Sequence, residues 1–281
     1  MNSFYLISII IALSMQNVMK KNYTKKCHGG VYFFGVLTSL SATLFFLLTS
    51  KGLEWNPKVI PYALAFAVAY SVTIVFGVLA IQYGALSLTS LVISYSLMIP
   101  TLYGLVFLDE SVGLGFWPGL VLLVISLVLI NKKIDQTPIS WRWIFCALLA
   151  FLGNGFCTVF QKMQQVAFGG AYKSELMIMA LLVVAITLSV ISLMKEKESI
   201  SKYVKEGWCF GAFSGIFNGI TNLFVMLLSS RMSASLMFPL ISAGGIVVTY
   251  IISKFAYKEK LSKRQFIGFV LGVASVIFLN I

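Results

Sequence analysis

The sequence contains one pattern twice: residues 108–131 are LDESVGLGFWPGLVLLVISLVLIN, and residues 257–280 are YKEKLSKRQFIGFVLGVASVIFLN. Both stretches place a few polar residues and glycines in an otherwise apolar run. At an offset of 149 the aligned polar and glycine pairs are Glu110 with Glu259, Gly119 with Gly268, Ser126 with Ser275 and Asn131 with Asn280. Polar residues are scarce in this chain, so these pairs indicate an internal repeat more strongly than coincident Val or Leu pairs do.

Around these stretches the chain divides into ten apolar segments of about the 20 residues that cross a bilayer core. The segments are 3–19, 30–50, 61–82, 85–108, 113–131, 141–162, 174–194, 207–229, 233–254 and 264–281. Backbone polar groups in lipid have to be satisfied within each segment, so the segments are expected to be helices. The fold class predicted is an all-α membrane protein with ten transmembrane helices.

The composition excludes a water-facing domain. The chain is 59% hydrophobic and 11% charged, with a net charge of +12, whereas a soluble domain carries about 25% charged residues. The positive charge lies in short loops between apolar runs, which argues against nucleic-acid binding and for membrane orientation. The four cysteines have no metal spacing, and we expect them to be reduced thiols that pack as small hydrophobic groups.

The basic residues predict which ends of the helices face the cytoplasm. Sixteen of the 21 Lys and Arg lie in or beside the odd-numbered connections, so these connections are expected in the cytoplasm and both termini outside. No basic residue precedes the first apolar run, which is typical of an uncleaved anchor and not of a secretory signal. We expect a multi-pass protein of the cell (inner or plasma) membrane.

The repeat predicts two homologous five-helix halves, residues 1–135 and 136–281. Five is odd, so the second half has to enter the membrane from the opposite side. The turn at 108–111 carries no positive charge, whereas the equivalent turn at 257–260 carries two lysines. Opposite charge at equivalent positions indicates inverted-topology repeats, which in many secondary transporters hold the substrate site near the midplane between the halves.

The same residues resemble the EamA type of the drug/metabolite transporter superfamily. The resemblance rests on the run IQYGALSL at 81–88, Pro100, the Asp109-Glu110 turn and Gly119. Its second copy runs from Ala234 through Pro239 and Lys258-Glu259 to Gly268. Asp109 and Lys258 stand where the family commonly has a turn glycine. The resemblance implies ten helices in two inverted halves and a central cavity lined by helices other than the fifth and the tenth.

Polar residues at helical spacing predict where a substrate could bind. The candidate substrate-binding residues are Asn154, Thr158 and Gln161 in the sixth segment, Asn218 and Asn222 in the eighth, Tyr70 in the third, Tyr95 in the fourth and Phe238 in the ninth. Two interpretations of these faces stay open, because polar and small residues also join helices by hydrogen bonds. Lys162, near a segment end, is a weaker candidate, since a lysine can extend its ammonium to the interface.

The positions of the acidic residues limit the possible transport mechanisms. All nine Asp and Glu fall in connections, in loops or at a segment edge, whereas an intramembrane carboxylate often marks a proton or cation site. Proton coupling through a central carboxylate is therefore not expected. The function predicted is secondary transport of a small metabolite, either an amino-acid-like or zwitterionic solute or a cationic amine-like one, by alternating access of the central cavity.

Two other classes of function are weaker. A membrane enzyme would need a catalytic constellation, but His28 lies in a basic loop without a nearby acid, and no metalloprotease or serine motif occurs. A non-transporting scaffold does not explain the repeat. No cofactor is expected, because the run Gly113-x-Gly115-x-x-x-Gly119 opens a membrane helix instead of following a strand. Glycine pairs at 115/119 and 268/272 can join the two halves or two copies in a homodimer.

Overall fold

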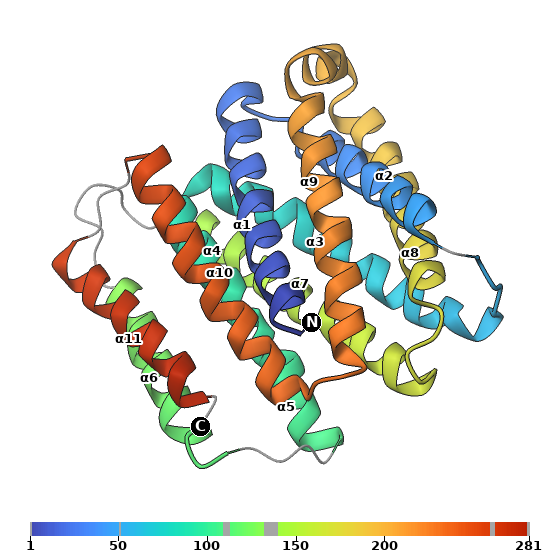
Figure 1. Ribbon diagram of the computed structural model, residues 1–281. Coiled ribbons are helices and arrows are strands. Elements are labelled where there is room, and N and C mark those ends of the chain that lie inside the picture. Colours follow the sequence, from blue (N-terminus) through green and yellow to red (C-terminus); the bar gives the residue numbers. More distant parts are fainter. Residues whose placement is uncertain (1, 51, 109–112, 132–139, 259–261, 280–281) are drawn as a thin grey trace.

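The computed structural model describes residues 2–50, 52–108, 113–131, 140–258 and 262–279, which form helices joined by short connections (Figure 1). The α-helices are α1 (Asn2–Cys27), α2 (Val31–Thr49), α3 (Ile60–Tyr83), α4 (Leu86–Ser94), α5 (Met98–Phe107), α6 (Phe116–Asn131), α7 (Trp141–Ala167), α8 (Lys173–Lys195), α9 (Ile200–Ser229), α10 (Ala234–Ala256) and α11 (Lys263–Leu279). Three short 3₁₀ helices are η1 (Pro57–Val59), η2 (Tyr95–Leu97) and η3 (Lys197–Ser199). These residues contain no strand, which confirms the all-α prediction for the described part of the chain.

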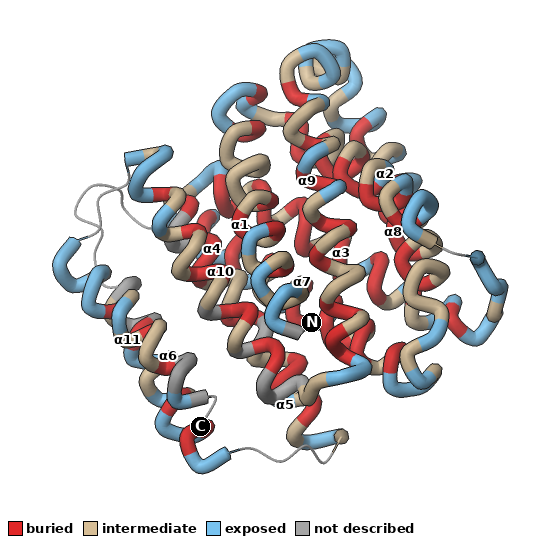
Figure 2. The backbone as a smooth tube through the Cα atoms, viewed as in Figure 1, coloured by how far each residue is buried: buried red, intermediate tan, exposed pale blue. Residues whose placement is uncertain are grey.

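Seven described helical segments are long and apolar enough, by length and composition, to cross a membrane. They are Ser3–Cys27, Val31–Thr49, Pro57–Tyr83, Thr89–Phe107, Trp141–Ala167, Lys173–Lys195 and Lys197–Ser229. Three shorter apolar helices are Phe116–Ser126, Leu240–Ala256 and Phe266–Ser275. Many large apolar side chains are exposed along these helices while the buried residues gather at the centre (Figure 2), as expected where lipid and not water surrounds the protein.

Several helices extend beyond the apolar runs that predicted them, and α1 and α9 do so by the most residues. The first was expected at 3–19, but α1 continues to Cys27 because neither glycine nor proline interrupts the chain before Gly29. Lys20, expected in a connection, is therefore on the helix. Similarly, α9 begins at Ile200 and not at 207, so Glu206 lies on a helix. Hydrophobicity sets the membrane-embedded length, whereas the helix itself ends only where the backbone requires it.

The fourth predicted segment, 85–108, is a broken helix. The α-helix α4 ends at Ser94, the 3₁₀ turn η2 follows, and α5 begins at Met98. Pro100 lies just after this break. A proline has no N–H to donate to the carbonyl four residues earlier, here Ser96, so a regular α-helical ladder cannot pass through this point.

Close approach of the helices at the centre depends on small residues. The most extensive helix pairs inside the bundle are α3 with α7 and α1 with α9. A glycine stripe at 207, 211, 215 and 219 follows one side of α9 and lies against α1 and α2. A Cβ at Gly215 would overlap the carbonyl oxygen of Thr38, so the two backbones touch there.

The helices α6 and α11 form a pair at one edge of the molecule (Figure 1). Ser126 donates a hydrogen bond to the carbonyl of Gly268 over 2.5 Å, and Ser275 donates to the carbonyl of Gly119 over 2.8 Å. The end of each helix thus meets the start of the other, so the pair is antiparallel. Gly272, from one of the predicted glycine pairs, packs against Ser126 within the same chain.

Some predicted features fall outside the described residues. The pair Glu110 and Glu259, the acid Asp135, and Asn280 all lie there, as does the side chain of Asn131. The cysteines are described: all four are free thiols, and Cys27, Cys146 and Cys157 are buried.

Candidate substrate cavity

A cavity of about 100 Å³ lies at the centre of the bundle, which is enough for several water molecules or a small solute. Its lining comes from α1 (Leu13, Gln16, Asn17, Lys20), α2 (Thr38), α3 (Phe66, Tyr70, Thr73, Ile74), α4 (Ser90, Ile93, Ser94), α7 (Asn154, Cys157, Thr158, Gln161), α9 (Asn218, Thr221, Asn222, Val225) and α10 (Phe238, Ile241, Gly245, Thr249). None of the described lining residues belongs to α6 or α11, as the family resemblance implies for the fifth and tenth segments.

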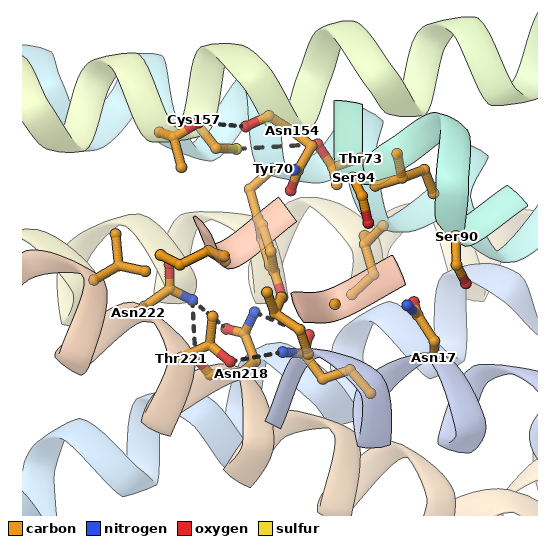
Figure 3. Close-up of a pocket in the computed structure, with 18 of the residues that line it drawn as sticks. Asn17, Tyr70, Thr73, Ser90, Ser94, Asn154, Cys157, Asn218, Thr221 and Asn222 are labelled. Atoms are coloured by element: carbon orange, nitrogen blue, oxygen red, sulfur yellow. Dashed lines mark hydrogen bonds between the residues drawn. The ribbon is translucent and has the colours of Figure 1, made fainter. Parts of the chain in front are cut away.

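A chain of amide side chains crosses the cavity from α1 through α9 to α7 (Figure 3). Gln16 donates to Thr221 over 3.2 Å and accepts from Asn218 over 3.4 Å. Asn222 donates to the side-chain oxygen of Asn218 over 3.0 Å and accepts from Gln161 over 2.6 Å. These groups satisfy one another, so they hold three helices together and at the same time present polar edges to the cavity.

Aromatic rings from α3 form an opposing wall. Phe66 and Tyr70 stack with ring centroids 5.6 Å apart and an interplanar angle of 18°. The tyrosine ring extends across the cavity to Asn218 (Figure 3). The pair therefore offers an apolar face with one hydroxyl at its edge, which suits a solute that has both apolar and polar parts.

The break in the fourth segment borders the cavity and is held by α7. Asn154 donates to the hydroxyl of Ser96 over 2.7 Å, and Ser96 in turn donates to the carbonyl of Ile93 over 2.5 Å. From the other side, Ser242 of α10 donates to the carbonyl of Ser94 over 2.7 Å. Two backbone carbonyls at the break are thus bound by side chains of η2 and α10, and Asn154 of α7 holds the η2 serine in place.

Seven of the eight predicted binding residues line this one cavity. They are Asn154, Thr158, Gln161, Asn218, Asn222, Tyr70 and Phe238. Tyr95 does not line it: its side chain is 1% exposed, and its hydroxyl donates to Ser126 of α6 over 3.3 Å. Neighbouring helix positions differ by about 100° around the axis, so Tyr95 points away from the face that carries Ser94. Whether the seven bind a solute stays a prediction.

The most consequential lining residue that the sequence prediction missed is Lys20. The prediction placed it in the first connection because it follows the apolar run 3–19. Its position one helical turn after Asn17, with no helix breaker between them, is the signal that would have placed both on one face.

The other lysine considered, Lys162, has a different place. It is buried on α7 and donates to the carbonyl of Ser229, at the last turn of α9, over 3.3 Å. A cation there satisfies a terminal carbonyl and interacts favourably with the negative end of the helix dipole. Lys162 is not part of the cavity lining.

No acidic residue of the part of the chain that the structure describes lines the cavity. Glu196 instead accepts hydrogen bonds from the backbone N–H groups of Tyr32 and Phe33, over 3.2 and 2.9 Å, at the start of α2. Glu175 accepts from the backbone N–H of Glu54 over 2.9 Å. The described residues also contain no group of His, Cys, Asp or Glu that could hold a metal ion.

The helical architecture and the enclosed polar cavity define a multi-pass membrane protein built around a central solute-sized site. The chain belongs to the EamA-like transporter family, whose family model matches residues 141–281. This match confirms the resemblance inferred from the sequence.

The fold is also that of a known structure. A solved structure described as "Crystal structure of protein" superposes with a TM-score of 0.71. The superposition covers 99% of this chain and 95% of that chain at 13% sequence identity, a level at which the likeness shows the fold alone. No curated protein matches the chain.

Proposed function

We propose that this protein is a secondary transporter that moves a small metabolite by exposing the central cavity alternately to the two sides of the membrane. The solute is amino-acid-like, zwitterionic or cationic and amine-like. The observation that carries the proposal is the cavity itself, which both halves of the chain line in equal measure. The helices α1 and α7 each contribute four lining residues, and so do α3 and α9.

Two inverted five-helix halves, 1–135 and 136–281, are part of this proposal. Counting α4, η2 and α5 as one span gives ten spans, in which α1 is equivalent to α7 and α3 to α9. The pairing of α3 with α7 then has its counterpart in the pairing of α1 with α9. The antiparallel packing of α6 on α11 supports the same relation, since a helix and its inverted equivalent run in opposite directions.

The broken fourth span supplies the element that can move. Discontinuous helices are typical of transporter substrate sites, where freed backbone groups face a polar cavity. Here the break is held by single hydrogen bonds, from Asn154 to Ser96 and from Ser242 to the carbonyl of Ser94. A solute that contacts Asn154 would therefore also act on the break.

The lining also bears on energy coupling. Because the described lining holds no carboxylate, we expect the transport cycle to run by facilitated diffusion, by exchange or by coupling through another kind of residue, and not by protonation of a central acid. The proposal also includes the orientation in the cell membrane, with the odd-numbered connections on the cytoplasmic side. It further includes a homodimeric arrangement.

Flux measurements on purified protein in liposomes test this function. The panel contains labelled amino acids, quaternary amines, nucleosides and sugars, with protein-free liposomes as reference. We expect at least one solute to cross faster with protein present, and Asn154→Leu or Asn218→Leu to slow it while the variants stay folded. The matched control is Gln82→Leu, an exposed amide at the end of α3. If no solute crosses faster than the reference, the proposed function is wrong; unchanged flux in both Asn variants removes these residues from the site.

A further inference from the structure

Among the described residues, Lys20 is the one charged side chain that lines the cavity. It extends from α1 toward α3, where a Cβ placed on Gly77 would lie 4.0 Å from the lysine Nζ. Within the described part of the chain the ammonium makes no hydrogen bond or ion pair. An unpaired charge among low-dielectric surroundings is unfavourable, and intramembrane ionisable residues usually serve a functional site.

Two further polar groups of the cavity lining also lack partners among the described residues. Asn17 lies one helical turn earlier on the same face of α1, and its amide makes no hydrogen bond to a described residue. Ser90 of α4 is 2% exposed, and its hydroxyl has no hydrogen-bond partner. In Figure 3 the side chains of Asn17 and Ser90 lie at the same end of the cavity.

This end differs from the rest of the lining. There Gln161 already donates to Asn222 and Asn222 to Asn218, so a solute has to compete with existing bonds. Around Lys20 the donors are unused: three ammonium protons, the two amide protons of Asn17 and the hydroxyl proton of Ser90. A group that only accepts hydrogen bonds and carries negative charge is complementary to such a set.

We propose that Lys20, Asn17 and Ser90 form a subsite for an anionic group of the solute, and that this group is a carboxylate. The proposal rests on the proposed function and narrows it: a zwitterion or an organic acid fits, whereas a solute that carries only an ammonium would meet Lys20 as a like charge. One lysine balances a single negative charge. A carboxylate can accept from all three residues, because its two oxygens provide about four acceptor positions.

A thermal-shift screen of the detergent-solubilised protein tests the subsite. The probes are the proteinogenic L-amino acids, the straight-chain acids from acetate to hexanoate, and the primary amines that lack the carboxylate, all at equal concentration. A ligand that binds the folded state raises the midpoint of unfolding. We expect at least one carboxylate-bearing probe to raise it and its carboxylate-free amine to have no effect.

Variants assign the effect to the subsite. Lys20→Met should weaken the affinity for the stabilising carboxylate by about tenfold or more, the loss expected for a charge-assisted hydrogen bond. Lys26→Met is the matched control, because Lys26 is exposed on the same helix and loses the same charge. If Lys20→Met does not fold, Ser90→Ala replaces it, with an expected loss of about threefold to tenfold.

Three results would overturn the subsite: no carboxylate stabilises the protein, the amines stabilise it equally, or the subsite variants bind the carboxylate as the wild type does. Liposome flux separates this failure from failure of the proposed function. Flux of an amine or a neutral solute without carboxylate binding leaves transport standing and removes the subsite. If carboxylate binding depends on Lys20 but no bound probe crosses the membrane, the subsite is supported and the proposed transport function is wrong.

Discussion

The hydroxyl of Ser126 donates a hydrogen bond to the carbonyl oxygen of Gly268, and the residues at the equivalent positions of the repeat exchange the same bond in the opposite sense, from Ser275 to Gly119. Both serines are fully buried. Because serine aligns with serine and glycine with glycine at the offset of 149, each bond is the counterpart of the other. This exchange of roles is the relation that a two-fold axis between α6 and α11 produces.

We predict that Ser126→Ala and Ser275→Ala each lower the free energy of unfolding by about 0.5–1.5 kcal/mol, since each leaves a buried carbonyl without its donor. Thermal unfolding of the purified variants in detergent measures the loss. Ser8→Ala is the control, because Ser8 of α1 donates to the carbonyl of Phe4, one turn earlier on an exposed face of α1. A loss in only one of the two variants would contradict the two-fold relation.

A second prediction concerns the glycine stripe of α9. Gly215→Ala should destabilise the protein by about 1–3 kcal/mol, because the new Cβ would overlap the Thr38 carbonyl and force α2 and α9 apart. In Gly77→Ala the nearest atom to the Cβ would be 3.8 Å away, in ordinary contact. Both changes raise helix propensity equally, so the difference between their unfolding midpoints isolates the packing cost. Equal midpoints would refute this view of the interface.

The carboxylate of Glu196 gives a third prediction. Glu196→Gln removes a negative charge from two N–H groups at the start of α2 and should cost about 1–2 kcal/mol of stability. The exposed neighbour in Glu198→Gln loses the same charge, and no change is expected there. Urea or thermal unfolding at two salt concentrations measures the difference. If the two variants are equally stable, the capping bonds contribute nothing.

Substitutions of the two tyrosines considered as binding residues should have different effects. Tyr70→Phe removes a hydroxyl that faces the cavity, and we expect it to weaken binding of a transported solute by about threefold to tenfold. Tyr95→Phe removes the bond to Ser126, outside the cavity lining, and should change stability without changing affinity. Equilibrium binding of the solute identified by flux measures both. An affinity loss with Tyr95→Phe alone would reverse the assignment.

Sequence predicted the helices well because lipid leaves few alternatives: an apolar run in a bilayer has to be helical. It also predicted the polar faces of α7 and α9, since helical spacing decides which side chains share a face. For that reason the prediction correctly grouped Asn154, Asn218 and Asn222, which line the same cavity.

The parts that sequence did not predict have local physical causes. The end of α1 is set by the glycines at 29 and 30 and not by the apolar run. The prediction therefore left Lys20 out of the cavity lining. Tyr95 lies outside the cavity lining for a different reason: it directly follows Ser94, and the step of about 100° between neighbouring helix positions turns the two side chains to different faces. The stripe of glycines on α9, by contrast, is visible in the sequence at steps of four and marks a close contact.

The hydrogen bond that the Gln16 side-chain amide donates to the hydroxyl of Thr221 has a consequence for how the protein is made. Its partners are 205 residues apart, and a ribosome adds about 5–20 residues each second, so Thr221 is synthesised about 10–40 s after Gln16. During that interval α1, the least apolar of the seven long segments, carries Gln16, Asn17 and Lys20 without α9 beside it. We therefore expect membrane insertion of α1 to depend on the insertion machinery, and the hydrogen bonds of its polar face to form only after α9 has been inserted.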